Sequence, residues 1–175
     1  MRVKIKRLSE NAVIPTYGKP GDAGMDITAI GRHFDEDGNV VYGTGLAFEI
    51  PEGFVGLLFP RSSNAKKDLV LTNSVGVIDS GYRGEVSFKF KPAAFFADDA
   101  WAEEPGTVGK IGDSFDYTIL PFGYEQDHAY GCALYEVGDR IGQIIIMPYP
   151  QVTFEEVEEL SFTERGEGAF GSTGK

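Results

Sequence analysis

Apolar residues follow two patterns along this chain, and both are typical of β-strands. In three stretches every second residue is apolar, and in four others the apolar residues form a short continuous run. A period of two indicates a strand with one buried face, whereas a short apolar run suits a strand buried on both faces. The predicted strands therefore cover residues 3–6, 48–50, 54–59, 69–71, 86–91, 144–147 and 152–154.

Turn-forming residues separate these stretches. The chain has 23 glycines and 9 prolines, without the three-residue period of collagen. Many short strands between turns rich in Gly, Pro, Asn and Asp predict an all-β sandwich or barrel. Only residues 63–68 and 155–160 favour a helix, and each segment is too short to be stable without packing.

The composition is that of a single folded domain of 175 residues, with 42% hydrophobic and 25% charged residues. A net charge of −11 argues against binding to nucleic acid or to an anionic membrane, since both need a basic face. One cysteine, Cys132, cannot form an internal disulfide, and we find no signal peptide and no membrane span. We therefore expect a soluble protein of the reduced cytoplasm.

Two segments differ from the rest of the chain. Residues 92–137 hold nine of the 22 aromatic residues, and nine acidic residues against the single Lys110. Residues 161–175 are rich in glycine, which is typical of a mobile arm. We predict one domain over residues 1–160, with 92–137 as an acidic aromatic insert, and a flexible arm over 161–175.

Three other segments carry groups suited to a nucleotide. Pro60–Ser63 follows a predicted strand and offers a guanidinium and two hydroxyls to phosphate oxygens. Residues 165–174 combine an arginine, hydroxyls and glycines with Phe170, whose ring can stack on a base. Residues 73–85 look like a β-hairpin that lines a slot for a flat heterocycle. The alternatives are a plain turn, a disordered tail and an ordinary hairpin, and the first two are commoner by composition alone.

Taken together and in order, these segments resemble the motifs of the trimeric dUTP diphosphatases (dUTPases). The five motifs correspond to residues 23–26 (AGMD), 60–63 (PRSS), 73–85, 138–143 (GDRIGQ) and 165–174. Three positions depart from the usual pattern: Asn64 replaces an apolar or small residue, Gly142 an alanine, and Ala169 a second glycine. The resemblance implies a dUTPase-like β-barrel or jelly roll, a distorted β-sandwich with little helix, assembled as a homotrimer.

The resemblance also implies a reaction, the hydrolysis of dUTP to dUMP and pyrophosphate. This reaction keeps uracil out of DNA and supplies dUMP for dTMP synthesis. Asp79 is then the general base that activates the attacking water, because an ionised carboxylate accepts a proton at neutral pH. Tyr82 lies against the deoxyribose and excludes a 2′-hydroxyl. Asn73, with main-chain groups around Gly76 and Val77, binds the uracil edge.

The remaining motifs imply groups that hold the triphosphate and close the site. Asp26 binds Mg2+ indirectly, through water. The other implied substrate-binding residues are Arg61, Ser62, Ser63, Arg140, Gln143, Arg165, Phe170, Gly171, Ser172 and Thr173. In the family's homotrimer one chain supplies the third motif, a neighbour supplies the first, second and fourth, and the remaining chain supplies the fifth.

The insert over residues 92–137 lies between the third and fourth motifs, as in some bacteriophage members, which favours a phage-encoded protein in a bacterial host. We interpret it either as a packing subdomain or as a surface for a basic protein partner. Two other functions stay open on the same fold, a dCTP deaminase and a catalytically silent nucleotide-sensing or partner-binding protein. His33 and His128 have no metal ligands at a suitable spacing, and Cys132 is expected in the core.

Overall fold

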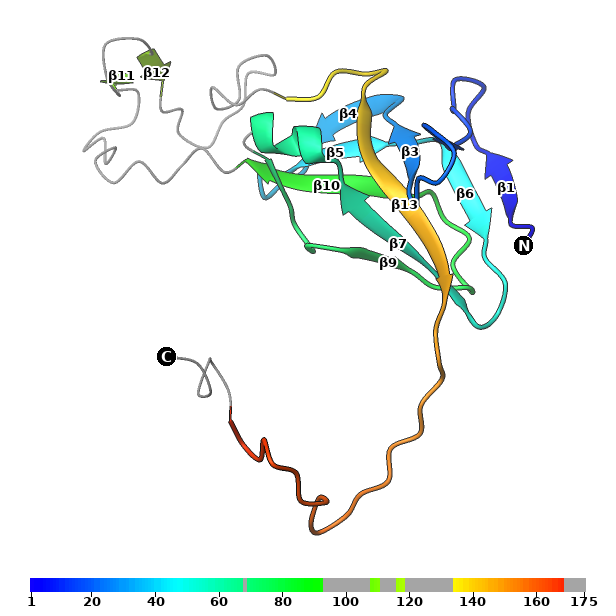
Figure 1. Cartoon of the computed structure of the whole chain (residues 1–175). Helices are drawn as coiled ribbons and strands as arrows, with labels where there is room; N and C mark the ends of the chain where they lie inside the picture. Colours follow the sequence, from blue (N-terminus) through cyan, green and yellow to red (C-terminus); the bar gives the residue numbers. More distant parts are fainter. Residues whose placement is uncertain (68, 93–107, 111–115, 119–133, 169–175) are drawn as a thin grey trace.

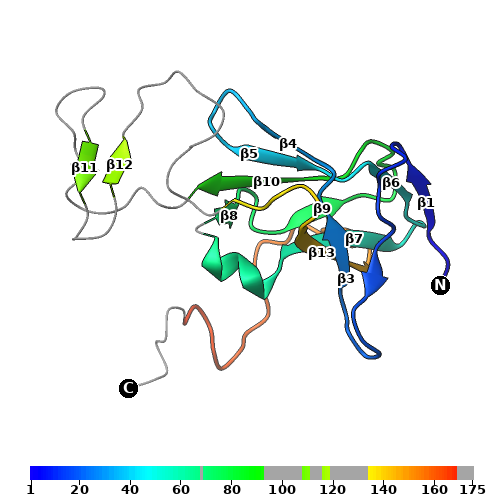
Figure 2. The same ribbon diagram turned by 90° about the horizontal axis from the view of Figure 1, so that it is seen from above.

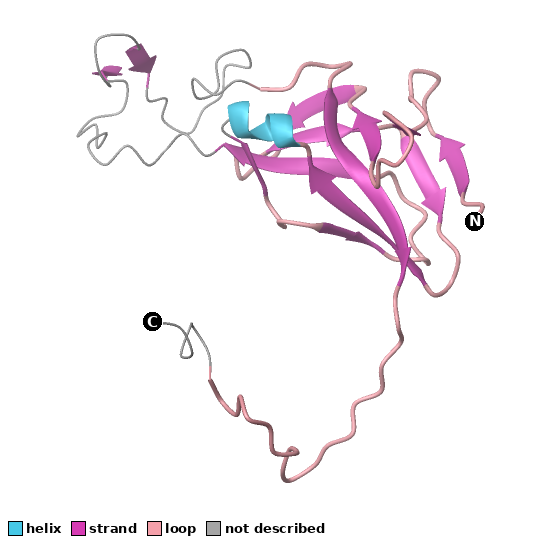
Figure 3. Cartoon of the chain, in the orientation of Figure 1, coloured by secondary structure: helices cyan, strands magenta, loops and turns pink. Residues whose placement is uncertain are grey.

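The computed structural model describes residues 1–67, 69–92, 108–110, 116–118 and 134–168. Its regular structure is almost entirely β-strand, and the helix drawn in Figure 3 is one short 3-10 helix, η1, over Ser62–Lys66. No helix in this described part of the chain is long and apolar enough to cross a membrane. The strands form two larger sheets and two separate strand pairs.

One of the larger sheets has five strands in the order β2-β3-β13-β7-β9. All of its pairings are antiparallel. The long strand β13 lies between β3 and β7, so that three distant parts of the sequence become neighbours (Figure 1). The strand bounds are β2 Thr16–Tyr17, β3 Met25–Thr28, β7 Phe54–Pro60, β9 Gly76–Ile78 and β13 Arg140–Pro148.

The other large sheet has four antiparallel strands in the order β4-β5-β10-β8. Two further antiparallel pairs are β1 with β6, and β11 with β12 inside the acidic insert. The bounds are β1 Lys4–Arg7, β4 Gly31–Phe34, β5 Val40–Gly43, β6 Leu46–Glu49, β8 Leu69–Leu71, β10 Ser87–Pro92, β11 Val108–Lys110 and β12 Asp116–Thr118.

The core lies between the two larger sheets, which form two layers in the view of Figure 2. Strand β10 illustrates why they pack, because Phe88 and Phe90 are buried while the residues between them are exposed. The five-stranded sheet adds Ile27, Leu58 and Ile144 to the same core. The expected all-β, dUTPase-like class with little helix is therefore confirmed, and six of the seven predicted strands coincide with observed ones.

The carboxyl-terminal part of the chain differs from prediction. Residues 152–154 form no strand and residues 155–160 form no helix. Beyond β13 the chain runs away from the barrel, and Phe154 and Leu160 are 93% and 89% exposed (Figure 1). A short segment that buries no surface gains nothing to offset the entropy of ordering it, so no regular element forms. The predicted boundary between domain and arm at residue 160 stays a prediction, although every residue from Met147 to Glu167 is exposed.

The expected hairpin over residues 73–85 is also wrong. Strand β9 pairs with β7 in the five-stranded sheet, whereas β10 pairs with β5 and β8 in the other sheet. Gly76 allows the β7 pairing, because a Cβ there would lie 3.0 Å from the Cβ of Leu58. The segment between β9 and β10 therefore crosses from one layer to the other instead of folding back on itself.

Candidate functional site

Residues of three predicted motifs meet where β3, β7 and β13 lie side by side. The carboxylate of Asp26 on β3 accepts hydrogen bonds from two arginines, with 2.8 Å from Arg61 Nε to Oδ1 and 2.9 Å from Arg140 Nη1 to Oδ2. Asp26 and Arg61 are half-buried, with side chains 21% and 27% exposed, and Arg140 is 57% exposed. We call Asp26, Arg61 and Arg140 the arginine cluster.

An irregularity in β13 explains how Arg140 reaches Asp26. Asp26 lies opposite Gln143 in the ladder, and Arg140 lies opposite Thr28. The register shifts between Arg140 and Gly142, and such a bulge changes the direction of a side chain. The guanidinium of Arg140 thereby reaches the carboxylate of a residue that is not its direct partner.

Gln143 lies on β13, between β3 and β7. It pairs with Asp26 on one side and with Phe59 on the other, and its side-chain amide donates to the carbonyl oxygen of Pro60 at 3.4 Å. A Cβ on Gly24 would overlap the Gln143 side-chain amide. The glycine of the first motif is therefore needed to leave room for the glutamine of the fourth.

The second motif continues from β7 into η1. Arg61 precedes this helix with an extended backbone, at φ −83° and ψ 159°. Its Nη1 lies 3.5 Å from Oγ of Ser63, a long hydrogen bond, and Ser62 is exposed beside it. The cluster thus offers guanidinium N–H groups and hydroxyls on one surface, which are suitable donors for phosphate oxygens.

The turn that follows β9 carries Asp79 and Tyr82, and both side chains are exposed. The amide of Tyr82 donates to the carbonyl oxygen of Asp79 at 3.0 Å, and its hydroxyl donates to the carbonyl oxygen of Glu85 at 2.9 Å. The Tyr82 ring folds over Gly84, where a Cβ would lie 2.5 Å from the hydroxyl oxygen. We call residues 79–83 the Asp79 turn.

Sequence reasoning gave Arg83 no role, although this residue holds the Asp79 turn. Its Nη1 donates to the carbonyl oxygens of Ser80 at 2.6 Å and of Tyr82 at 2.8 Å. The sequence signal for this role is weak, because it shows an arginine near Gly81 and Gly84 but only the conformation of the turn decides which carbonyl oxygens Arg83 reaches. Arg83 therefore keeps the backbone on either side of Gly81 in one conformation.

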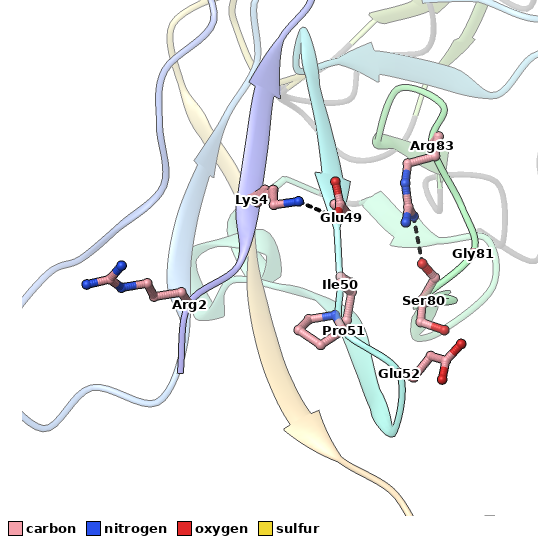
Figure 4. A pocket seen from close by; sticks show the side chains of 9 residues that line it. All are labelled: Arg2, Lys4, Glu49, Ile50, Pro51, Glu52, Ser80, Gly81 and Arg83. Carbon is pink, nitrogen blue, oxygen red and sulfur yellow. Dashed lines mark hydrogen bonds and ion pairs between the residues drawn. The ribbon is translucent and has the colours of Figure 1, made fainter.

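A hollow of about 370 Å³ lies beside the Asp79 turn. Figure 4 shows Lys4 directed at Glu49 and Arg83 directed at Ser80, whereas Arg2 points away. The hydrogen bond and charge of Lys4, with a weaker contribution from the charge of Arg83, hold the pKa of Glu49 below its usual range. Because Lys4, Glu49 and Arg83 already make hydrogen bonds within the protein, this hollow is not assigned a ligand.

Two of the predicted uracil-binding residues line a second hollow. Asn73 and Gly76 face this space of about 200 Å³ together with Leu58, Leu71 and Lys89. Val77, the residue after Gly76 in β9, is 61% exposed and is not among the residues that line this hollow. The hollow is small and partly apolar, as expected for a site that takes a flat base.

The two groups of residues do not meet within one chain. Asp79 follows Ile78, which lies opposite Gly56, whereas Arg61 comes five residues after Gly56, directly beyond the end of β7. At about 3.3 Å per residue, this difference in register is roughly 17 Å along the strand. The arginine cluster and the Asp79 turn therefore lie near opposite ends of β7 (Figure 1).

The arm is described only as far as residue 168. Arg165 Nε donates to the carbonyl oxygen of Gly168 at 3.1 Å, within the arm itself. Phe170, Gly171, Ser172 and Thr173 lie outside the described residues, as do His128 and Cys132. His33 is exposed on β4. The described residues contain no group of three or more His, Cys, Asp or Glu side chains that could hold a metal ion.

Comparisons with known proteins agree on one family. The family model described as dUTPase matches residues 10–94 and 133–174. A deoxyuridine 5′-triphosphate nucleotidohydrolase of Nautilia profundicola is 34% identical over 177 residues, covering 100% of both chains. The family match leaves out residues 95–132, which fall within the predicted insert.

Two solved structures from staphylococcal phages are similar over most of the chain. The dUTPase of Staphylococcus bacteriophage 80alpha with dUpNHpp has a TM-score of 0.72 and 32% identity, covering 99% of each chain, and is described as controlling transfer of virulence genes. A dUTPase variant of phage phi11 of S. aureus, described with a structural Mg(II) ion, has a TM-score of 0.65 and 27% identity. The match covers 93% of this chain and 100% of that one.

Proposed function

Because this chain belongs to the dUTPase family, we propose that it hydrolyses dUTP to dUMP and pyrophosphate. The observation that carries this proposal is the arginine cluster beside Ser62 and Gln143, together with an exposed carboxylate at Asp79. The cluster supplies donors for a triphosphate, and Asp79 supplies a proton acceptor. Both are required for an attack of water on phosphorus.

In the proposed reaction Asp79 takes a proton from a water molecule, whose oxygen attacks the α-phosphorus in line. The new P–O bond forms as the bond from the α-phosphorus to the pyrophosphate oxygen breaks. Negative charge grows on the leaving pyrophosphate, where fixed N–H donors stabilise it. Arg61, Arg140 and Gln143 are placed for this role, since each guanidinium has further N–H groups besides the one bound to Asp26.

Base and sugar selection belongs to the hollow at β9 and to Tyr82. Asn73 and the main chain at Gly76 and Val77 bind the uracil edge, and cytosine is refused because it presents a donor where uracil has an acceptor. The ring of Tyr82 lies against the deoxyribose and leaves no room for a 2′-hydroxyl. In the arm, Arg165, Phe170, Ser172 and Thr173 close over the bound nucleotide and exclude water.

The residues of the arginine cluster fit a magnesium ion carried by the triphosphate. Both oxygens of Asp26 already accept a hydrogen bond from an arginine, which suits a carboxylate that contacts the ion through water. Bound Mg2+ offsets negative charge on the phosphates. Asp26 then has two tasks, holding the two guanidinium groups and accepting hydrogen bonds from water bound to the ion.

The substrate assay tests this function against its alternatives. The protein is incubated with dUTP, dCTP, dTTP or UTP and Mg2+, and pyrophosphate and nucleotide products are measured. We expect release of pyrophosphate from dUTP only. Conversion of dCTP to dUMP would identify a deaminase, and binding of dUTP without any product would identify a nucleotide-sensing protein; either result overturns the proposal.

We further propose that the active site is shared between chains of a homotrimer. The support is the separation of roughly 17 Å along the direction of β7 between the level of Ile78, which precedes Asp79, and that of Arg61 in one chain. In a trimer, the Asp79 turn of one subunit can lie beside the arginine cluster of a neighbouring subunit, so the two groups do not have to approach each other within one chain. The exposed apolar side chains of residues 152–162 are consistent with an arm that packs on another copy.

Mixing two inactive variants tests the shared site. Asp79→Asn and Arg61→Gln chains are co-expressed in equal amounts, so that each chain type carries one intact half. Random assembly of shared sites restores about one quarter of wild-type activity, because each site needs one intact group from each of two chains. No recovery in mixed trimers, verified by mass, would contradict a shared site.

The acidic insert is proposed as the surface for a protein partner. Nine acidic residues against one lysine over 92–137 favour a basic partner, and the similar phage 80alpha dUTPase is described as controlling transfer of virulence genes. Deleting the insert is expected to abolish capture of such a partner while turnover of dUTP continues. Loss of the trimer with partner capture retained would support a packing role instead.

A further inference from the structure

Tyr135 lies near the carboxyl-terminal end of the predicted insert over residues 92–137. It is buried, with 2% of its surface exposed. Its main chain is held on both sides by the hydroxyl of Tyr42, which donates to the Tyr135 carbonyl oxygen at 3.0 Å and accepts from its amide at 2.9 Å. Arg32 Nη1 donates a second hydrogen bond to the same carbonyl oxygen at 3.1 Å. Burial raises the pKa of Tyr42 to about 12, so this hydroxyl keeps its proton at neutral pH.

The ring of Tyr135 is also fixed. It packs at 6.0 Å from the ring of Tyr42 and at 5.9 Å from the ring of Phe90, measured between centroids. The ammonium group of Lys67 lies 5.1 Å from the ring centroid and donates to the carbonyl oxygen of Leu134 at 2.8 Å. Tyr135 is therefore a rigid point of the core.

The hydroxyl of Tyr135 reaches from this rigid point to η1. It donates to Oδ1 of Asn64 at 3.3 Å, and the Asn64 amide in turn donates to the carbonyl oxygen of Leu69. Burial raises the pKa of Tyr135, and the nearby Ser63 hydroxyl and the charge of Arg61 oppose this rise. Asn64 departs from the family pattern, and its contact with Tyr135 is a physical reason for a polar residue there.

Besides these contacts of Asn64, and within the described part of the chain, the 3-10 helix is tied to the barrel by hydrogen bonds only at its flanks, where Arg61 donates to Asp26 and Lys67 donates to the carbonyl oxygen of Leu134. None of its five residues is buried, and no side chain caps its first turn. Its own hydrogen bonds, from Asn64 to Arg61 and from Lys67 to Asn64, keep it folded but do not fix its place on the barrel. A short element of this kind depends on tertiary contacts for its position.

We infer that Tyr135 is a positioning residue for the triphosphate: its hydroxyl holds η1 in place, and through η1 it holds Arg61 and Ser62 against the phosphates. This inference rests on the proposed function, since it assigns Arg61 and Ser62 to phosphate binding. It does not make Tyr135 a catalytic residue, because the proposed effect of its hydroxyl on the phosphates runs through Asn64 and η1.

Tyr135→Phe tests the inference, because it deletes the hydroxyl and keeps the ring in the core. We expect KM for dUTP, and Kd for the non-hydrolysable analogue dUpNHpp, to rise about three- to tenfold, the range for one lost hydrogen bond. We expect kcat to stay within about twofold of wild type. Kd for dUMP, which lacks the β- and γ-phosphates, should change less than Kd for dUpNHpp.

Thr44→Val is the matched control, because it also deletes one buried hydroxyl without changing side-chain size. Thr44 is 0% exposed, and its hydroxyl donates to the carbonyl oxygen of Val86 at 2.6 Å, outside η1. We expect this variant to lower thermal stability while KM and both Kd values stay at wild-type levels. An equal rise in KM for Thr44→Val and Tyr135→Phe would reduce the Tyr135 effect to general destabilisation and overturn the inference.

Asn64→Ala separates the path through Asn64 from other effects. If the Tyr135 hydroxyl acts through Asn64, the double variant with Tyr135→Phe and Asn64→Ala binds dUpNHpp no more weakly than the weaker-binding of the two single variants. Additive losses would contradict a path through Asn64. Unchanged KM and Kd in Tyr135→Phe would refute the inference while dUTP turnover by the wild type still supports the proposed function, whereas an inactive wild type would refute the function itself.

Discussion

The arginine cluster and the Asp79 turn are built in opposite ways. The cluster joins side chains from β3, from β13 and from the residue that follows β7, and one of its contacts links Asp26 to a residue 114 positions away. The Asp79 turn is held almost entirely by itself, through hydrogen bonds of Tyr82 and Arg83 to carbonyl groups at most three residues away. The first depends on the tertiary fold, and the second depends on local backbone structure.

This difference indicates which mutations should disturb each group. A change in the sheet or the core should disturb the arginine cluster and leave the turn intact. A change in the turn should alter the reactive carboxylate without moving the arginines. Binding of the triphosphate and activation of water are therefore expected to respond to different mutations.

The largest effect is expected at the turn, for Asp79→Asn. Loss of the proton acceptor should lower kcat by about 10²- to 10⁴-fold, because this is the usual contribution of a general base. Kd for dUpNHpp should change little, since the arginine cluster is untouched. Stopped-flow or steady-state assays of pyrophosphate release measure kcat, and isothermal titration calorimetry measures Kd for dUpNHpp.

The control for Asp79→Asn is Asp37→Asn, which makes the same chemical change at an exposed carboxylate between β4 and β5. Its kinetics should match the wild type. Turnover by Asp79→Asn at the rate of the control would remove Asp79 from the mechanism.

The next largest effect is expected in the cluster, for Asp26→Asn. The amide keeps the size of the side chain but no longer holds two guanidinium groups by charge, so their positions loosen. We expect kcat/KM for dUTP to fall about 10- to 100-fold, as for other residues next to a metal site, and the Mg2+ requirement to rise. A Mg2+ titration of activity measures both, and an unchanged Mg2+ requirement would limit Asp26 to holding the arginines.

A core change next to the cluster should have a smaller effect, mainly on stability. A Cβ on Gly142 would overlap the buried ring of Phe88, so Gly142→Ala should destabilise the fold by about 1–3 kcal/mol. Because Gly142 lies between Arg140 and Gln143, we also expect a higher KM for dUTP with little change in kcat. Urea unfolding and steady-state kinetics measure these two effects.

Gly31→Ala is the matched control for Gly142→Ala. Gly31 also lies in a strand, and a Cβ there meets nothing within 4 Å. Its unfolding midpoint should stay close to that of the wild type. If both alanine variants lose the same stability, loss of glycine as such and not the contact with Phe88 is the cause.

The smallest effect is expected beside the Asp79 turn, for Glu49→Gln. Lys4 first, and Arg83 second, lower the pKa of Glu49 in the folded protein. The stabilising contribution is therefore present above the unfolded pKa of about 4.3 and is lost as the pH falls through the lower folded value. Glu49→Gln should lower the urea midpoint slightly at pH 7, and this difference should disappear once the pH falls below the lowered pKa of Glu49 in the folded protein.

Glu52→Gln is the control for the pH dependence. Glu52 lines the same hollow, and no ion pair within 4 Å joins it to the described residues. A midpoint difference for Glu49→Gln that persists unchanged at pH 3 would mean that the pairing with Lys4 is not its source.

The sequence predicted the groups more completely than their positions. Arg61 and Asp79 were recognisable because the five ordered motifs together resemble those of a known family, not because of local composition alone. The role of Arg83 was missed, because its carbonyl partners are defined by the conformation of the turn and not by residue type. The contact between Asn64 and Tyr135 was missed because 71 residues separate them.

Two mistaken predictions have the same origin. The segment over 152–160 has apolar residues at suitable positions, but it buries none of them in this chain. Residues 73–85 have the composition of a hairpin, but β9 pairs with β7 and not with β10. Local composition therefore indicated the type of element that could form, and burial decided whether it formed and with what partner.

Alternating side chains alone determined that this protein is made of β-strands, because the period of two is a property of each short segment. The residue types of its motifs likewise indicated which chemical groups are available to bind a nucleotide. Only the tertiary structure decided that β13 lies between β3 and β7, and thus that Asp26, Arg61 and Arg140 meet while Asp79 stays apart. The reason is that pairing between distant strands depends on how two whole sheets bury their faces, which no single segment encodes.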